Sequence, residues 1–430
     1  MNYGATNLKS GGLSTFEISS DDDEELLSFQ VSNSIQVQKK EPSKLTRLIG
    51  FTVVLITFSF LFVASSKLKS EDHWESADGS NKKSQAFLEF RVKHGKVYES
   101  DEEMSKRYQI FINNLDEIKR RNMEEKRAGG SAVHGVTKFA DMTDDEFAEL
   151  YSGIHASAGT SSETQKSSPN NLEYPPITLN YANWIGVYTT PVNVQGHCGS
   201  CWAISSVEQI ESDVIRVLGD EYGYTPQSLH LSPQQLLDCV YFGVTYGCNG
   251  GWPSTAFEYV MAQGLEMNVT YPYIAHNETV CKADPSQYVV SLVNHTDVWM
   301  NESFMMTHVL TTGPLAVGVN AAMLKYYYGG VIEWCGPDGP ISHGVQVVGL
   351  NMVDPKTPYW IVRNSWGSDW GVDGYFFVGF GSNTCNISYY SSFTEPMKYG
   401  VPLDLDEDDD DDDDGDDQGY YSENDDDKDD

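Results

Sequence analysis

The sequence predicts an α+β fold, in which a helical region precedes a unit that mixes helices and strands. Residues 85–122 are typical of helix, and apolar residues after Cys201 recur at the spacing of an amphipathic helix. Residues 172–397 are rich in Trp, Tyr and Gly and contain hydrophobic runs typical of strands. The chain has 430 residues and is 40% hydrophobic, which is enough apolar material for a buried core.

An uncharged segment near the N-terminus predicts a membrane anchor. No charged residue occurs between Arg47 and Lys67, and about 20 apolar residues cross a bilayer as a helix. A cleaved signal peptide has a shorter apolar core close to the N-terminus, whereas 47 residues precede this one. We therefore expect residues 48–66 to form a transmembrane signal anchor, with an atypical cleaved signal as the alternative.

Basic residues predict the orientation of this anchor. Lys and Arg are more frequent before the apolar segment than after it, where Glu71 and Asp72 dilute them. The positive-inside rule then places residues 1–47 in the cytosol as a tail and the later residues in the lumen or outside. In that tail, an acidic residue precedes a Leu pair by four positions, and this pattern resembles an acidic dileucine signal read by sorting adaptors; its residues are Asp22, Leu26 and Leu27.

Two further features fit a lumenal folded unit. Residues 151–171 are rich in Ser, Thr, Gly and Pro, a composition typical of a linker. Five Asn-X-Ser/Thr sequons follow the apolar segment and are candidates for glycosylation, not all of which we expect to be used: Asn268, Asn277, Asn294, Asn301 and Asn386.

The charge of the chain excludes one class of partner. Lys and Arg number 28 against 63 Asp and Glu, which gives a formal net charge of −35. Nucleic-acid binding needs clustered Lys and Arg, so we expect no nucleic-acid partner. Residues 404–430 contain 18 acidic residues and one Lys, and such a run cannot pack. We therefore expect residues 398–430 to be a disordered acidic tail, with weak Ca²⁺ association or removal during maturation as alternatives.

The motif with the clearest chemistry is QGHCGSCW, from Gln195 to Trp202. A zinc site needs four ligands, and no second close Cys/His pair complements Cys198 and Cys201. A thioredoxin-type redox pair normally has Trp before its first Cys, whereas Trp202 follows the second. The predicted helix begins at Cys201, and a helix N-terminus favours the thiolate over the thiol. A nucleophilic Cys needs that preference and a His to pair with it.

The motif resembles the active-site segment of papain-like cysteine peptidases, for which C-G-S-C-W is a local signature. The resemblance implies a His and an Asn far downstream. His343 precedes the strand-like run VQVVGL, and Asn364 follows the run YWIVR. By this resemblance Cys201 is the nucleophile, His343 transfers protons, and Asn364 orients the imidazole. The Gln195 amide and the Cys201 N–H would form the oxyanion hole.

The resemblance implies a two-lobed papain-like fold and a known chemistry. A helical lobe would carry Cys201, and a β-barrel-like lobe would carry the His and Asn, with the cleft between them. Trp366 would shield the His–Asn bond from water, and Trp202 would be a supporting residue. Peptide bonds would be hydrolysed through a thioester acyl-enzyme without a metal or organic cofactor. The alternatives are an inactive binding homologue, an acidic-tail scaffold for Ca²⁺ or basic partners, and a thiol–disulfide oxidoreductase using Cys198 and Cys201.

The chain has seven Cys, so at least one thiol stays unpaired in any set of intramolecular disulfides. The six that remain when Cys201 is set aside can pair in many ways. The resemblance implies one set, namely Cys198–Cys248, Cys239–Cys281 and Cys335–Cys385. Disulfides need an oxidising compartment, in agreement with the predicted topology.

The helical region resembles the inhibitory propeptide of cathepsin L-like enzymes. Six residues match the pattern E-x3-R-x3-F-x2-N-x3-I-x3-N, namely Glu103, Arg107, Phe111, Asn114, Ile118 and Asn122. Residues 135–141 resemble a second motif, G-x-N-x-F-x-D, with Thr137 where Asn is usual. The implied zymogen domain, residues 80–150, would run backwards through the cleft and block Cys201. Cleavage in the linker would release the catalytic domain, residues 172–397.

Further matches imply how substrates bind. Gly250 and Gly251 correspond to glycines whose backbone pairs with a bound peptide. A roomy apolar pocket for a bulky hydrophobic P2 residue would be shaped by Trp252, Pro253, Gly318 and Gly344, with Tyr390 or Ser391 at its floor. The short spacing between Cys239 and Cys248 leaves no room for the occluding insertion of cathepsin B-type exopeptidases, so we expect an endopeptidase.

Topology and resemblance together predict a monomeric type II membrane precursor. After processing it would act in a lysosome- or vacuole-like acidic compartment, with an extracellular destination as the alternative. Its expected partners are protein and peptide substrates, its own propeptide as intramolecular inhibitor, cystatin-type inhibitors and sorting adaptors.

Overall fold

The structure is a computed structural model that describes residues 77–154, 179–243, 245–278, 280–336 and 339–400. Several predicted features lie outside these residues: the sorting signal at Asp22, Leu26 and Leu27, the apolar segment 48–66, most of the linker, and the acidic tail beyond residue 400. Within the described part, no helix combines the length and the apolarity that a membrane crossing requires. The chain divides into two compact units between Ile112 and Asn113.

The stretch predicted to be helical, residues 85–122, consists of two helices. Helix α3 spans Ala77–Lys93, and α4 spans Asp101–Ala128. The turn between them contains Gly95 with a φ of 60°, a left-handed conformation that glycine adopts without steric cost. Helix is therefore confirmed on both sides of an interruption that the spacing of apolar residues did not reveal.

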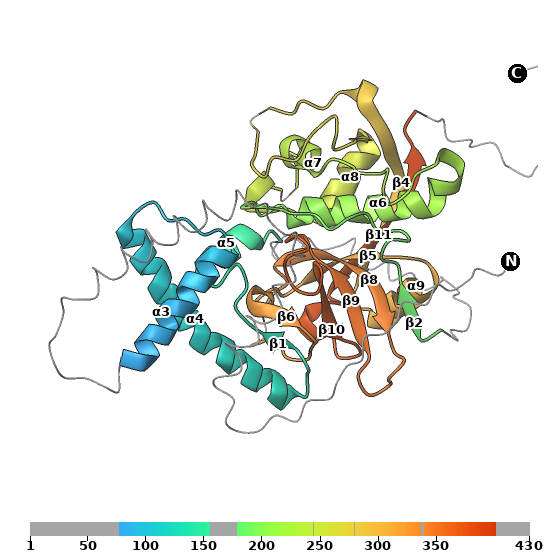
Figure 1. Cartoon of the computed structure of the whole chain (residues 1–430). Coiled ribbons are helices and arrows are strands. Elements are labelled where there is room, and N and C mark those ends of the chain that lie inside the picture. The colour runs from blue at the N-terminus through green and yellow to red at the C-terminus, as the bar shows by residue number, and fades with distance from the viewer. Residues whose placement is uncertain (1–76, 155–178, 244, 279, 337–338, 401–430) are drawn as a thin grey trace, which may run out of the picture. The chain divides into compact units, whose positions relative to one another are not determined.

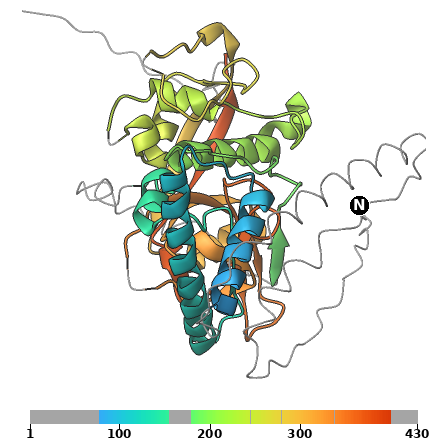
Figure 2. The ribbon, with the colours of Figure 1, turned by 60° about the vertical axis from the view of Figure 1, so that its left-hand side comes forward.

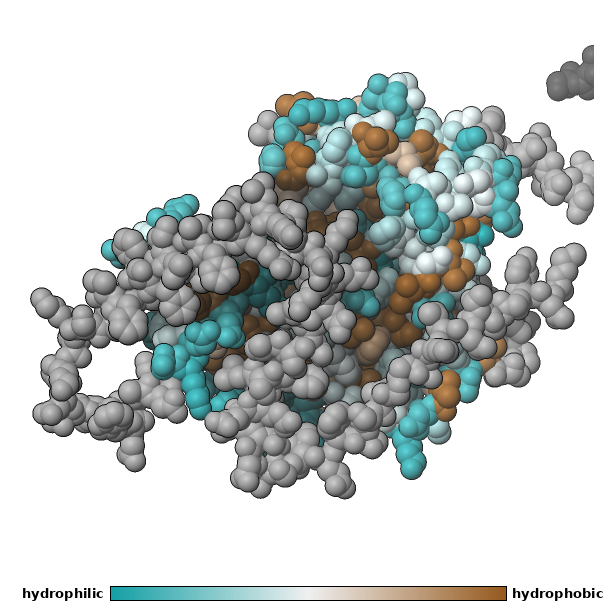
Figure 3. All heavy atoms as spheres, in the orientation of Figure 1, coloured by the Kyte–Doolittle hydropathy of each residue, from teal (hydrophilic) through white to brown (hydrophobic). Residues whose placement is uncertain are grey.

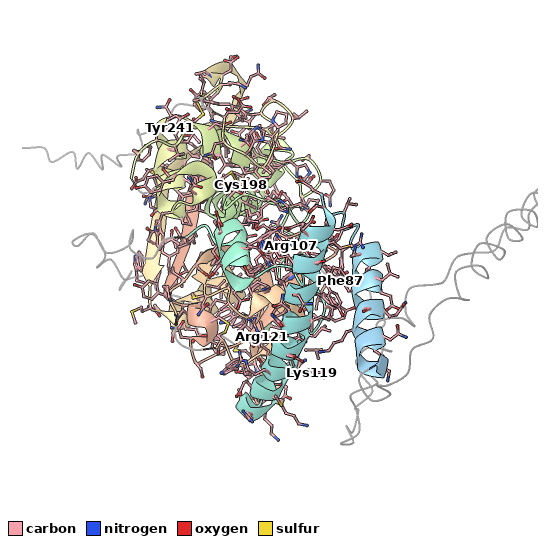
Figure 4. All side chains as sticks on the ribbon, turned by 90° about the vertical axis from the view of Figure 1, so that its left-hand side faces the viewer. Phe87, Arg107, Lys119, Arg121, Cys198 and Tyr241 are labelled. Carbon is pink, nitrogen blue, oxygen red and sulfur yellow. A yellow bond between two sulfur atoms is a disulfide. The ribbon has the colours of Figure 1, made fainter. Side chains whose placement is uncertain are left out.

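Aromatic side chains join α3 to the first half of α4, which lies beside it in Figure 2. The ring centroids of Phe87 and Phe90 on α3 lie 5.3 and 5.0 Å from that of Phe111 on α4. Phe111 is fully buried, and Arg107 donates to Glu103 one turn earlier at 2.6 Å. Phe87 and Arg107 are labelled in Figure 4. The first half of the propeptide motif thus forms the packing of this unit.

In the second unit, the later motif residues hold the chain that follows α4. The Asn114 side-chain amide donates to the carbonyls of Ala140 and Met142, both at 2.8 Å. Asn122 donates to the His134 carbonyl and accepts from the His134 N–H. Because these bonds reach backbone groups 12 to 28 residues away, the asparagines fix the path of the segment that leads to α5 (Asp144–Tyr151).

Three helices form one side of the catalytic half: α6 (Cys201–Tyr222), α7 (Pro233–Cys239) and α8 (Pro253–Ala262). Helix α6 is the predicted amphipathic helix, and it ends at Gly223, which has a φ of 73° and caps it. Its predicted apolar face is buried, with the exception of Val217, which is 48% exposed. Figure 3 shows hydrophilic and hydrophobic side chains interspersed over the part that carries these helices.

The other side is a sheet of nine strands within the described residues, in the order β3-β4-β11-β5-β8-β9-β10-β7, with β2 paired to β8. All neighbours are antiparallel except β7 and β10. The strands span β2 Tyr181–Asn183, β3 Leu265–Glu266, β4 Tyr288–Trp299, β5 Leu315–Val319, β7 Val331–Ile332, β8 His343–Asn351, β9 Tyr359–Arg363, β10 Tyr375–Gly379 and β11 Tyr390–Lys398. The two runs predicted as strands after the His and before the Asn are confirmed as β8 and β9.

Smaller elements complete the described part. Helix α9 spans Glu302–Thr311, and the two-stranded pair β1 (Val133–His134) and β6 (Tyr327–Gly329) joins the propeptide segment to the catalytic half. Single 3-10 turns lie at Gly247–Asn249, Pro285–Gln287, Leu324–Tyr326 and Thr384–Asn386.

Two hydrophobic cores lie within the second unit, one around the helices and one around the sheet. Helix α6 lies between them, because it packs on α7 and α8 on one side and on β8 and β11 on the other (Figure 1). The N-terminus of α6 therefore lies where the two halves meet. The expected α+β arrangement, with a helical lobe and a β-rich lobe, is confirmed.

Candidate active site

Cys201 is the first residue of α6 and is fully buried. The structure describes all seven cysteines, and Cys201 is the free one. The other six form the three pairs that the resemblance implies, Cys198–Cys248, Cys239–Cys281 and Cys335–Cys385. Because Cys198 is bonded to Cys248, it does not form a redox pair with Cys201, and the oxidoreductase interpretation loses its second thiol.

His343 and Asn364 come together from adjacent strands. His343 begins β8, Asn364 follows β9, and the antiparallel pairing of these strands brings them side by side. The His343 Nε2 lies 2.8 Å from the Asn364 Oδ1, while Nδ1 makes no hydrogen bond to a described residue. The indole of Trp366 stacks on the imidazole at 4.9 Å, which covers the His–Asn bond.

The backbone next to His343 touches Cys201. A Cβ on Gly344 would lie 2.9 Å from the Cys201 carbonyl oxygen, so only glycine allows β8 to approach α6 this closely. The backbone that carries the thiol and the backbone next to the imidazole thus come from different lobes and pack against each other here, and Nδ1 is the ring nitrogen of His343 that Asn364 does not occupy.

The Gln195 side chain is held by three hydrogen bonds. Its Oε1 accepts from the Trp366 indole at 2.9 Å and from the Ser365 hydroxyl at 2.8 Å. Its Nε2 donates to the Cys198 carbonyl at 2.9 Å. Because both acceptor bonds fix the oxygen end, the amide N–H₂ keeps one orientation, with one hydrogen on the Cys198 carbonyl. Ser365 is a functional contact that the sequence analysis missed, although it lies inside the Asn-Ser-Trp-Gly run.

Trp202 supports the helical side of the site. It is fully buried, and its indole N–H donates to the Gly247 carbonyl at 3.0 Å. A Cβ on Gly251 would lie 2.5 Å from the Trp202 ring. The predicted substrate-binding glycine therefore lies directly on this indole and has no room for a side chain, so no side chain of its own shields its N–H from a peptide.

A propeptide segment covers the thiol. The Gly251 N–H donates to the Gly153 carbonyl at 2.8 Å, and the Ile154 N–H donates to the Ser342 carbonyl at 3.0 Å. A Cβ on Gly153 would lie 2.9 Å from the Cys201 Sγ. Residues Ser152–Ile154, the covering segment, thus make one backbone bond to each lobe and leave no space above the sulfur.

A second stretch, the docking segment Thr137–Tyr151, holds the propeptide by side chains. Phe139, Phe147 and Tyr151 all meet the Trp366 ring edge-on, at centroid distances of 5.3, 5.4 and 5.8 Å. The Lys138 ammonium donates to the Trp366 carbonyl at 2.6 Å. The same indole that shields the His–Asn bond is therefore the platform on which the docking segment packs.

Polar contacts tie the docking segment to the turn Leu324–Tyr326. The buried Lys325 ammonium donates to the Met142 carbonyl and to the Asp144 carboxylate, both at 2.7 Å. The Thr137 hydroxyl donates to the Lys325 carbonyl at 2.5 Å. Thr137 thus makes a buried contact in the position where the propeptide motif usually has Asn.

A cation from α4 reaches the same turn. Arg121, labelled in Figure 4, lies 4.6 Å from the centre of the Tyr326 ring, and it donates to the Ala322 carbonyl at 2.6 Å. The guanidinium is almost fully buried and pairs with Glu117 one turn earlier at 2.8 Å. The Arg121 guanidinium, neutralised by Glu117, therefore covers the Tyr326 ring when the propeptide is docked.

Burial keeps the thiol and the imidazole neutral in this precursor. It raises the pKa of Cys201 to about 11, although the N–H groups of Gly344, Gly153, Trp202 and Cys201 itself act to lower it. Burial also lowers the pKa of His343 to about 4, against the Asn364 hydrogen bond and the nearby Tyr151 backbone. The predicted preference for the thiolate is wrong for the covered site, because loss of water outweighs the helix N-terminus.

Two of the predicted P2 pocket residues, Trp252 and Tyr390, form an aromatic pair. Tyr390 is fully buried, and its ring centroid lies 4.9 Å from that of Trp252, whereas the Ser391 hydroxyl donates to the Val298 carbonyl. A Cβ on Gly318 would lie 2.6 Å from the Ile341 side chain. Pro253 begins α8 directly after Trp252. Of the two floor candidates, Tyr390 is the one against Trp252.

The five sequon asparagines differ in exposure. Asn277 and Asn294 are exposed, whereas the other three are partly buried. Asn268 accepts from the Tyr273 N–H, Asn301 caps α9 by accepting from the Phe304 N–H, and the Asn386 amide nitrogen donates to the Gly339 carbonyl. Asn277 also accepts from the Cys248 N–H.

No cluster of three or more His, Cys, Asp or Glu among the described residues could hold a metal ion. His197, which lies inside the QGHCGSCW motif, is exposed. Tyr273, which the sequence analysis did not single out, reaches the Gln195 backbone at 2.7 Å. No local pattern marks this tyrosine, because its partner lies 78 residues earlier.

Comparisons with known proteins agree with this geometry. Residues 178–394 match the family described as papain family cysteine protease, and residues 87–147 match the cathepsin propeptide inhibitor domain. Cysteine proteinase 1 of Dictyostelium discoideum is 33% identical over 322 residues, which cover 71% of this chain and 91% of that protein. The cathepsin L-like proteinase of Phaedon cochleariae is also 33% identical, over 71% of this chain and 92% of its own length.

Solved structures match as well. The digestive procathepsin L2 from Tenebrio molitor larval midgut superimposes with a TM-score of 0.64 at 29% identity, and the match covers 73% of this chain and 99% of that one. The recombinant stem bromelain precursor gives a TM-score of 0.59 at 31% identity, over 73% and 98%. With its two lobes, its free thiol and its covering propeptide, this chain belongs to the papain family of cysteine proteases and carries a cathepsin-type inhibitory propeptide.

Proposed function

We propose that the chain is the zymogen of a cysteine endopeptidase in which Cys201 is the nucleophile, His343 the proton carrier and Asn364 the residue that orients the imidazole. One observation carries this assignment. The one free thiol begins α6, next to the strand whose first residue bonds to Asn364 at 2.8 Å, and a propeptide segment covers it. A catalytically inactive homologue would not need all of these groups in this arrangement.

The reaction begins once the covering segment leaves. Water then reaches the site, and His343 Nδ1 takes the proton of the Cys201 thiol. The thiolate attacks the scissile carbonyl carbon, and the oxyanion accepts hydrogen bonds from the Cys201 N–H and the Gln195 amide. Loss of one such donor typically costs about 3–4 kcal/mol of transition-state stabilisation.

The imidazolium returns the proton to the leaving amine, and this step leaves a thioester on Cys201. His343 then takes a proton from water, and the resulting hydroxide equivalent attacks the thioester carbonyl. Collapse of this second intermediate releases the acid product and restores the thiol.

The test of these roles is covalent labelling. The full-length precursor is processed with pepsin, so that its own activity is not required, and is then treated with an epoxysuccinyl peptide inhibitor. We expect one label per chain, on Cys201, and no peptidase activity in Cys201→Ala. Peptidase activity that survives in Cys201→Ala would contradict the assignment, and Cys198→Ser should lower stability rather than abolish labelling.

The preference for a bulky hydrophobic P2 residue is part of the proposal. Trp252 and Tyr390 form its apolar wall and floor, and Ile154 of the covering segment belongs to the same hydrophobic cluster. Because the Tyr390 ring fills part of the space, we expect branched aliphatic P2 residues to be favoured over aromatic ones. A P2-varied peptide library assayed from about pH 4 to 7.5 tests this, and Tyr390→Ala should shift the preference toward aromatic residues.

The cellular part of the proposal rests on the sequence features outside the described residues. The apolar segment 48–66 supports a type II anchor, and the dileucine pattern supports delivery to an acidic lysosome- or vacuole-like compartment. Cleavage within the linker 151–171 and the residues that follow would release the soluble enzyme. Carbonate extraction of the full-length chain tests the anchor: the precursor should stay in the membrane pellet, and its release into the supernatant would contradict it.

A further inference from the structure

We propose that Tyr273 is a positioning residue that aligns the two donors of the oxyanion hole through a single phenolic oxygen. The proposal rests on the roles assigned above to Cys201 and Gln195, and it adds a residue that does not itself touch the substrate. Its hydroxyl contacts both ends of the loop that carries those donors.

The hydroxyl has two partners. The Tyr273 Oη lies 2.5 Å from the Ser200 Oγ and 2.7 Å from the Gln195 carbonyl oxygen. A carbonyl can only accept, so the single phenolic hydrogen points to Gln195. The Ser200 hydroxyl must therefore donate to the phenolic oxygen, and the three groups form one chain of hydrogen bonds from Ser200 through Tyr273 to Gln195.

Each partner adjoins an oxyanion donor. Ser200 immediately precedes Cys201, whose N–H is one donor, and Gln195 carries the other donor on its side chain. Ser200 lies at the N-cap of α6, yet its side chain makes no capping bond to the helix. A serine at this position would ordinarily cap the helix. Here its hydroxyl instead makes the hydrogen bond to the Tyr273 oxygen.

Tyr273 is itself held in place. The Tyr273 N–H donates to the Asn268 side chain at 3.0 Å, and a Cβ on Gly196 would come within 3.0 Å of Ala275. The loop of Tyr273 is thus packed directly on the loop of Gln195. Burial raises the pKa of Tyr273 to about 12, so the hydroxyl remains a donor throughout the working pH range.

The opposite side of Gln195 is held by the β-rich lobe. Its N–H donates to the Ser365 carbonyl at 2.8 Å, and its side chain accepts from Ser365 and Trp366. Tyr273 supplies the matching restraint from the helical lobe. If that restraint is removed, the Gln195 backbone is anchored on one side only, and the separation of the two donors can change.

This geometry predicts a specific kinetic change. Tyr273→Phe keeps the ring and removes the oxygen, so substrate binding outside the reacting bond should be unaffected. A small misplacement of reacting groups costs roughly 10- to 100-fold in rate. We therefore expect kcat to fall by about that factor with KM nearly unchanged, and Ser200→Ala to show a smaller loss of the same kind.

The matched control is Tyr271→Phe. Tyr271 lies two residues earlier and is buried, whereas Tyr273 is partly buried. The Tyr271 hydroxyl donates to the Asp238 carboxylate at 3.0 Å and not to the active-site loop. The kcat of Tyr271→Phe should stay close to that of the unmodified enzyme. All variants are made as full-length precursors, processed with pepsin, and counted by titration with the epoxysuccinyl inhibitor.

Two reagents separate positioning from general damage. A peptide aldehyde forms a tetrahedral adduct whose oxygen occupies the oxyanion hole, so its affinity should fall in parallel with kcat in Tyr273→Phe. Iodoacetamide alkylation needs the thiolate but not the oxyanion hole, so its rate should stay within about twofold.

The inference is overturned if kcat is unchanged in Tyr273→Phe, or if alkylation falls as much as aldehyde affinity. Should Tyr273→Phe fail to fold, Ser200→Ala decides by the same two criteria. Neither result bears on the assignment of the nucleophile, because that assignment stands or falls with Cys201→Ala.

Discussion

The covering segment and the docking segment of the propeptide hold to the enzyme by different means. The covering segment, Ser152–Ile154, uses backbone hydrogen bonds to Gly251 and Ser342, and a glycine lies over the sulfur. The docking segment, Thr137–Tyr151, uses three aromatic rings on Trp366 and a buried Lys325 pair. The part that blocks the chemistry thus holds through its backbone and the single buried Ile154 side chain, while the part that provides affinity depends on several side chains.

This difference explains how a propeptide can inhibit an enzyme that cuts peptides. A peptide backbone is what the cleft binds, so a backbone alone cannot be selective. Selectivity therefore has to come from the aromatic contact, which lies beside the catalytic groups and not on them. The following changes should separate the two contributions, from the largest expected effect to the smallest.

Phe139→Ala should have the largest effect. Phe139 is 1% exposed and contacts Trp366, Phe147 and Tyr151, and deletion of such a ring costs about 3–5 kcal/mol. We expect the intact precursor to react with the epoxysuccinyl inhibitor at neutral pH far faster than the unmodified precursor. Val133→Ala, at a half-exposed propeptide residue, is the control. Equal labelling rates in the two variants would show that the aromatic contact does not hold the propeptide.

Glu211, which lies outside both segments, should make the folding stability depend on pH. Burial raises its pKa to about 7, against Arg363 and hydrogen bonds from Thr190 and the Leu231 N–H. The folded state therefore binds more protons than the unfolded state between about pH 4.5 and 7. The contribution of Glu211 to stability is therefore fully present below that window and is lost as pH rises through it, by up to about 3 kcal/mol, whereas the lowered pKa of the buried His343 acts in the opposite direction.

The measurement is the melting temperature at several pH values, in precursor and processed enzyme. The difference in melting temperature between Glu211→Gln and the unmodified chain should move in favour of the variant as pH rises from about 4.5 to 7, in both forms. A difference that does not change with pH would place the titrating group elsewhere. Because the group lies away from both propeptide segments, a pH step seen only in the precursor would also contradict this account.

Gly153→Ala tests the covering segment alone. The added methyl would lie 2.1 Å from the Gly199 carbonyl oxygen and 2.9 Å from the Cys201 Sγ, and the Gly199 backbone cannot move easily. Overpacking of this kind costs about 1–3 kcal/mol, so Cys201 labelling in the intact precursor should rise by roughly 10- to 100-fold. Ser152→Ala, which adds no atoms, should label as the unmodified chain does. No increase in Gly153→Ala would mean that the segment does not lie against the thiol.

Asp144→Asn should have the smallest effect. Its carboxylate pairs with the buried Lys325 but is itself 69% exposed, and such pairs contribute about 1 kcal/mol or less. The labelling rate of the precursor at neutral pH should rise by no more than about fivefold. A rise as large as that of Phe139→Ala would reverse the ranking of aromatic over charged contacts.

Much of the site was predictable because its residues lie in local runs. Gln195 to Trp202 and Asn364 to Trp366 are short motifs, and the helix and strands that carry them follow from apolar spacing. The choice between Tyr390 and Ser391 was not predictable, because it depends on which side chain of β11 faces Trp252. The interruption at Gly95 was hidden for a similar reason, since a single glycine inside a helical pattern does not specify its φ.

The protonation state of the site was predicted wrongly for an instructive reason. A helix N-terminus lowers a thiol pKa when water still reaches the sulfur, and the sequence gives no measure of burial by a distant segment. Tyr273 escaped notice because its role depends on a loop contact across 78 residues. Contacts of this kind are set by the fold and not by the neighbouring sequence.

The central claim is that the covering segment keeps the Cys201–His343 pair neutral until it is removed. The most direct test is the ultraviolet absorbance of the thiolate, measured against pH as the difference between the unmodified chain and Cys201→Ser. We predict no thiolate in the intact precursor below about pH 9 and a clear thiolate signal near pH 6 after processing. A thiolate signal of equal size in the intact precursor at neutral pH would contradict the claim.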